Sequence, residues 1–145
     1  MRLAVALAGM WVGGCGAAEQ PLPLTQLLSQ CDSFKGKSVQ VGGYLDDCAK
    51  YSCQLFTGKP GSERFVAVES AGVARSAIGI GGDNEAFDQK AAPLQRSYVV
   101  VTGRVDDRSC DGQGGTDRSP GLHPSDIRAS TMTEAAPAKL VVRNS

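Results

Sequence analysis

Apolar and polar residues alternate with a period of two along residues 37–46 (KSVQVGGYLD) and 97–106 (SYVVVTGRVD). The positions that share one face are Val39, Val41, Gly43 and Leu45 in the first stretch, and Val99, Val101, Gly103 and Val105 in the second. Successive side chains of a β-strand point to opposite sides, so each stretch predicts a strand with one buried face.

Further strands are expected at residues 51–57 and 64–69, on either side of the turn GKPG at residues 58–61. The Gly-rich, apolar residues 72–82 leave room for one more short strand. Weaker strand patterns follow near the C-terminus, at residues 126–133 and 139–143.

Two helices are expected. Apolar side chains recur with helical spacing at Leu24, Leu27, Leu28 and Cys31, with Thr25 or an earlier residue as the cap and an end before Gly36. Residues 84–92 form the second predicted helix. Asp83 or Asn84 is its expected N-cap, and Pro93 its stop.

With the first helix set aside, the predicted order is β-β-β-α-β-β. This is the order of the OB-fold, a five-stranded Greek-key barrel with a helix between strands three and four. The chain also resembles small exported bacterial OB-fold proteins, in GKSVQVGG at residues 36–43 and its echo YVVVTGR at residues 98–104. The resemblance covers residues 24–133 and implies a mainly β fold. Another small barrel or an incomplete β-sandwich is the alternative.

The pattern of the N-terminal residues predicts an export signal. Arg2 precedes a ten-residue apolar stretch, residues 3–12, which fits a signal peptide and is too short to span a bilayer. The segment Val12-Gly13-Gly14-Cys15 then resembles the lipobox of bacterial lipoproteins. That resemblance implies acylation of Cys15, including a fatty acid such as palmitate, and cleavage just before it. An ordinary secretory signal with a chance cysteine is the alternative.

The expected organisation is a signal peptide (1–14), a tether (15–23) and one domain (24–145). Because Gly16 and not Asp follows Cys15, the resemblance implies an outer-membrane protein that faces the periplasm. Loss of Arg2 from a chain with 15 basic and 15 acidic residues leaves a formal charge of about −1. No nucleic-acid partner is expected, since such a chain lacks a broad positive field.

Four cysteines remain after cleavage, and an even number in an exported chain indicates two disulfides. The OB-fold makes strands one and four antiparallel neighbours. It therefore implies Cys31–Cys110 at one end of that pair and Cys48–Cys53 across the next connection. A zinc site is disfavoured because Cys48 and Cys53 lack the usual two-residue spacing. We expect no metal and no cofactor.

The candidates for catalysis are weak. His123 is the only histidine, and we expect it on a surface loop before Pro124. No Gly-x-Ser-x-Gly elbow supplies a nucleophile. Carboxylates occur in the pairs 46–47 and 106–107 and at Asp111 and Asp117, but their spacing does not match an EF-hand. The Gly-rich residues 79–82 lack the spacing of a phosphate-binding loop.

If a ligand binds, the predicted surface is the outward face of the first and fourth strands. It carries Tyr44, Tyr98 and Arg104, with Tyr51 nearby. The sequence thus predicts a lipid-anchored, non-enzymatic envelope module that binds a protein or a saccharide. A small hydrolase or transferase using carboxylates and a structural component of an envelope complex are the alternatives.

Overall fold

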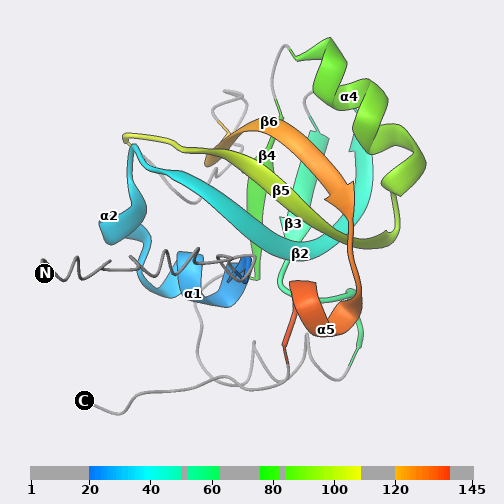
Figure 1. Ribbon diagram of the computed structural model, residues 1–145, viewed down its shortest axis with the longest axis horizontal. Coiled ribbons are helices and arrows are strands. Elements are labelled where there is room, and N and C mark those ends of the chain that lie inside the picture. Colours follow the sequence, from blue (N-terminus) through cyan, green and yellow to red (C-terminus); the bar gives the residue numbers. More distant parts are fainter. Residues whose placement is uncertain (1–19, 50–51, 63–75, 82–83, 109–119, 138–145) are drawn as a thin grey trace, which may run out of the picture.

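The computed structural model describes residues 20–49, 52–62, 76–81, 84–108 and 120–137 (Figure 1). In these residues the fold is mainly β, with a six-stranded mixed sheet. The strands are β1 (Leu22–Pro23), β2 (Ser38–Ala49), β3 (Ser52–Phe56), β4 (Ala77–Ile80), β5 (Ser97–Val105) and β6 (Leu122–Ala129). The helices are α1 (Leu24–Ser29), α2 (Cys31–Phe34), α4 (Glu85–Ala91) and α5 (Met132–Ala135), with a 3-10 turn at Ala92–Leu94.

The long strand β2 organises the sheet. It pairs antiparallel with β5 from Ser38↔Arg104 to Leu45↔Ser97, which confirms that the two alternating stretches are antiparallel neighbours. Its other edge pairs with β1 and then with β3. β3 continues to β4, β4 meets β6 at one parallel pair, and β6 returns to β5. The pairings therefore run β2–β3–β4–β6–β5 and back to β2.

The core lies on the face that the alternating pattern predicts. Val41, Leu45, Val99, Val101 and Val105 are all buried. Leu55 of β3 and Ile78 of β4 extend the same cluster. Two helices contribute the largest remaining groups, namely Leu24 and Leu27 from α1 and Phe87 from α4. Each such side chain contributes roughly 1.5–3 kcal/mol when it is fully buried.

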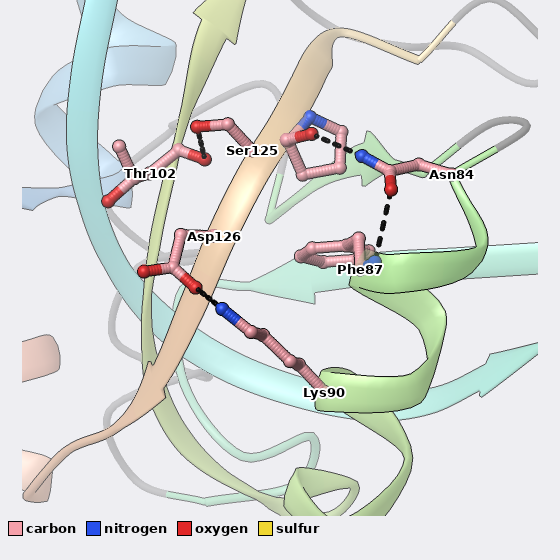
Figure 2. A network of polar contacts seen from close by, with 7 residues as sticks. Asn84, Phe87, Lys90, Thr102, Ser125 and Asp126 are labelled. Carbon is pink, nitrogen blue, oxygen red and sulfur yellow. Dashed lines mark hydrogen bonds and ion pairs between the residues drawn. The ribbon is translucent and has the colours of Figure 1, made fainter.

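Helix α4 is fixed to β6 by polar contacts at both of its ends (Figure 2). At its N-terminus, the Asn84 side-chain oxygen accepts from the backbone N–H of Phe87 (3.1 Å), and its amide donates to the Pro124 carbonyl (3.1 Å). Near its C-terminus, Lys90 Nζ lies 2.8 Å from Asp126 Oδ1. α4 thus packs on β6, which shares one residue pair with β4 among the described residues.

Helix α5 covers the outer face of the sheet at the middle of the β2–β5 ladder. A Cβ on Gly42 would lie 2.6 Å from Ala135 Cα, so only glycine permits this approach. Val100, which pairs with Gly42 across the ladder, is 1% exposed. An ion pair between Arg128 and Glu134 joins α5 to β6 and holds the pKa of Glu134 below its usual value, mainly through the hydrogen bond from Arg128.

Several predicted elements differ from the structure. The helix expected from Leu24 is two short helices, and its N-cap position is Pro23, without a capping side chain. The strand that pairs with β3 is Ala77–Ile80, from the Gly-rich stretch. The last described strand begins at Leu122, four residues before the predicted one. The segments predicted as strands at residues 64–69 and 139–143 lie outside the described residues, as does the predicted signal and tether up to residue 19.

Candidate functional site

Three aromatic side chains form a row across three neighbouring strands. Tyr44 of β2 pairs directly with Phe56 of β3 on one side and with Tyr98 of β5 on the other. Directly opposite residues share a face of the sheet. Since Leu45 and Leu55 face the core, these three residues lie on the outer face. We call Phe56, Tyr44 and Tyr98 the aromatic row.

Tyr44 is the centre of the aromatic row and is the most enclosed member, at 6% exposed. Its ring meets that of Tyr98 edge to face, with centroids 5.2 Å apart and planes at 73°. Such pairs contribute about 0.5–1.5 kcal/mol beyond the area they bury. Burial raises the pKa of the Tyr44 phenol, and the nearby Asp46 carboxylate raises it further.

The two outer members remain accessible. Phe56 and Tyr98 are half-buried. The Tyr98 hydroxyl accepts a hydrogen bond from the backbone N–H of Lys59 at 3.3 Å, so the turn after β3 lies against the end of this ring. Phe56 and Tyr98 therefore offer aromatic surface to solvent, and the Tyr98 ring also packs against that of Tyr44.

Arg104 is not part of this arrangement. It pairs with Ser38 at the far end of the same ladder, six residues from Tyr98, which corresponds to about 20 Å along a strand. α5 covers the surface between them. Arg104 instead forms an exposed ion pair with Asp107 at 3.0 Å. The structure thus brings together Tyr44 and Tyr98 of the predicted face but not Arg104, and Tyr51 lies outside the described residues.

The far end of the ladder gathers charged groups, which we call the charged end: Arg104, Asp106, Asp107 and His123. His123 lies on β6 opposite Arg104 and not in a loop as expected. Its Nε2 is 2.8 Å from Asp106 Oδ2. The other Asp106 oxygen accepts from the backbone N–H of Arg108 at 2.9 Å.

The predicted acidic pairs are separated, because Asp46 and Asp106 lie at opposite ends of the β2–β5 ladder. Asp47 forms an ion pair with Arg96 at 3.0 Å. Asp111 and Asp117 lie outside the described residues. In the part of the chain that the structure describes, no three His, Cys, Asp or Glu side chains are grouped so as to hold a metal ion.

The cysteine prediction is confirmed where it can be examined. Cys48 and Cys53 are directly opposite in the β2–β3 ladder and form a disulfide with a Cα–Cα distance of 4.1 Å. Cys31 is also disulfide-bonded. Its predicted partner Cys110 lies outside the described residues, and so does Cys15.

Comparison with protein-family models, with curated proteins and with solved structures finds no match to this chain. Within the described segments, every helix falls short of the length and apolar character that crossing a bilayer demands.

Proposed function

We propose that this protein is a bacterial lipoprotein, anchored through Cys15, whose domain is OB-fold-like and binds an envelope protein or saccharide without catalysis. Gly16 after Cys15, in place of Asp, supports a position in the outer membrane facing the periplasm. The lipobox-like Val12-Gly13-Gly14-Cys15 supports the anchor. A disulfide at Cys48–Cys53 and a second at Cys31 support export, because disulfides persist in oxidising compartments.

The strand pairings support the OB-fold. With β1 set aside, the five strands neighbour one another in the circuit β2–β3–β4–β6–β5, and β5 pairs with β2 again. The α4 helix lies between the third and fourth of these strands in the chain. Both features are those of the five-stranded Greek-key barrel.

The aromatic row carries the proposal of a binding function. OB-folds bind oligonucleotides and oligosaccharides on an exposed strand face, and aromatic rings there stack on flat or apolar parts of a ligand. Phe56 and Tyr98 are half-buried and lie on either side of the buried Tyr44. Tyrosine at such a position offers both apolar area and a hydroxyl, as is common at interfaces.

The anchor is tested by labelling cells with a radioactive fatty acid. We expect label in the wild-type protein and none in Cys15→Ser. A Cys15→Ser protein that still takes up label would contradict the anchor and leave the domain's function to be tested separately.

The binding function is tested by crosslinking in intact cells, followed by purification of the full-length protein. We expect Tyr98→Ala to reduce capture of its partner about tenfold, the size of one lost aromatic contact. Arg104→Ala, on the same face but at the charged end, is the matched control and should capture normally. Tyr98→Phe keeps the ring and removes only the hydroxyl that accepts a hydrogen bond from the Lys59 backbone N–H.

Equal capture by Tyr98→Ala and Arg104→Ala would contradict the aromatic row as the binding surface. Tight binding of single-stranded DNA at physiological salt would contradict the proposal as a whole, because a near-neutral chain gains little from phosphate contacts.

A small hydrolase is the second candidate, and the His123–Asp106 pair favours it. A histidine held by a carboxylate is the base of many nucleophilic enzymes. Turnover of a panel of esters and peptidoglycan fragments, lost in His123→Gln, would support this function instead. Absence of turnover by the wild-type protein would contradict the hydrolase function.

A further inference from the structure

The N-terminal segment is held in the sheet from its first described strand. β1 pairs in parallel with β2 through Leu22↔Val41 and Pro23↔Gly42. α1 begins at the next residue and buries Leu24 and Leu27 in the core. The chain is therefore fixed to the domain from residue 22, which is seven residues after Cys15.

This distance along the chain is short compared with the domain. Seven residues span at most about 25 Å when fully extended. A domain of about 120 residues has a radius of gyration near 13 Å, and hence a diameter of about 35 Å. A lipid at Cys15 would thus keep the side that carries β1 and α1 closer to the bilayer than the opposite side. Figure 1 shows that α4 lies on that opposite side of the molecule.

The chemistry of the β1–α1 surface, which we define as residues 20–31, suits this position. It contains no charged residue. The exposed side chains of α1 and its C-cap are Gln26, Ser29 and Gln30. Amides and hydroxyls hydrogen-bond to phosphate and glycerol oxygens, and an uncharged surface is not repelled by anionic lipids. α4, in contrast, carries Glu85, Asp88 and Lys90.

We infer that the β1–α1 surface faces the membrane and contacts phospholipid headgroups, while α4 points into the periplasm. The orientation rests on the anchor at Cys15 proposed above. It leaves α4 and the strands beside it open to other proteins.

Energy transfer from tryptophan to the membrane tests this orientation. The only tryptophan, Trp11, lies in the signal segment, so the processed protein has none. Gln26→Trp on α1 and Gln89→Trp on α4 form a matched pair, since both residues are glutamines and exposed. Each processed, full-length variant is placed in phosphatidylethanolamine–phosphatidylglycerol vesicles that contain a dansyl-headgroup lipid. Vesicles without dansyl give the reference emission.

We expect transfer at least about twofold more efficient from Gln26→Trp, because α1 would lie next to the bilayer and α4 on the opposite side of a domain about 35 Å across. Transfer should not change with salt, since the β1–α1 surface is uncharged. Ser29→Trp and Ala92→Trp provide a second exposed pair if a first variant unfolds.

Vesicle flotation distinguishes a failure of the proposed anchor from a failure of the proposed orientation. A protein that does not float lacks the anchor, and both the anchor and the orientation are then wrong. A protein that floats but transfers equally from both sites, or better from Gln89→Trp, keeps the anchor and overturns the orientation alone. Transfer from Gln89→Trp that rises with the anionic lipid fraction would also overturn it.

Discussion

The two ends of the β2–β5 ladder use the same face of the same strands in different ways. At one end, Tyr44 and Tyr98 pack edge to face, and Tyr44 is almost fully enclosed. At the other end, Arg104 and Asp107 form an ion pair with both side chains exposed. α5 covers the ladder between them. The strand pattern therefore assigns a residue to a face of the sheet, whereas the segments that pack on that face decide whether the residue stabilises the fold.

The largest difference is expected when each end loses its main side chain. Tyr44→Ala should lower the free energy of unfolding by about 3–5 kcal/mol, as for other buried aromatic residues. Arg104→Ala should change it by less than about 0.5 kcal/mol, because exposed ion pairs contribute little. Urea denaturation followed by circular dichroism measures both. Similar losses of unfolding free energy in the two variants would show that the two ends of the ladder contribute alike to stability.

The disulfide beside the aromatic end should have the next largest effect. Replacing both Cys48 and Cys53 with Ala removes a closed loop of about six residues, for which the loop-entropy model gives roughly 2 kcal/mol. The double variant leaves Cys31 and its bond unchanged. The same denaturation experiment measures the loss. An unchanged midpoint would show that this end is held by packing alone.

The enclosure of Tyr44 also predicts an effect at alkaline pH. Burial raises the pKa of Tyr44 above the usual tyrosine value of 10.0. The unfolded chain then loses this proton first, so the stabilisation is complete below pH 10 and is lost as pH rises toward the folded-state pKa. Ultraviolet titration should show an ionisation step above pH 10 that Tyr44→Phe removes. A late step that persists in Tyr44→Phe would contradict the enclosure of Tyr44.

The smallest effect is expected for the exposed ion pair of Lys90 and Asp126, which joins α4 to β6. The hydrogen bond from Lys90 lowers the pKa of Asp126 below 3.8. Its contribution to stability is therefore present above pH 3.8 and is lost as pH falls through the lower, folded-state pKa. Asp126→Asn should flatten the acid side of the stability profile slightly, and added salt should reduce the difference from wild type. A variant with an unchanged acid profile would show that the pair contributes nothing.

Much of the ladder was predictable because its signals are local. The alternation of Val39, Val41 and Leu45 with polar residues set both the strand and its buried face. Residue chemistry limited the N-cap of α4 to Asp83 or Asn84, and in the structure it is Asn84. The strand β6 was harder, since Pro124 normally argues against a strand. The structure accommodates it at a register shift between Thr102 and Gly103, a site where proline is tolerated.

The aromatic row was only partly predictable, because a register shift decides which side Phe56 faces. The Cys48↔Cys53 pair, continued without interruption, would place Phe56 opposite Leu45 and toward the core. A shift between Leu45 and Cys48 instead places Phe56 opposite Tyr44 on the outer face. A slip of one residue reverses the two faces of a strand. The sequence of residues 52–56 contains no local signal for this register shift.

The separation of Arg104 from the tyrosines had a different cause. Two residues on the same face of a strand can lie far apart along it. The surface between Arg104 and the tyrosines is covered by residues 132–135, which are distant in the sequence. Gly42 was the one available signal, since a glycine inside a strand often marks a close approach of backbone. Its partner, Ala135, is visible only once the chain is folded.

The two hydrogen bonds of the Asn84 side chain limit which residue types can occupy the N-cap position of α4. Its oxygen caps the helix while its amide nitrogen donates to a carbonyl on β6. Aspartate, elsewhere an equally good N-cap, has the same shape but no donor. It would bring a carboxylate oxygen against the Pro124 carbonyl, and serine or threonine would be too short to reach both groups. At this helix start, four residue types that are nearly interchangeable as caps are reduced to one by a neighbour forty positions away in the sequence.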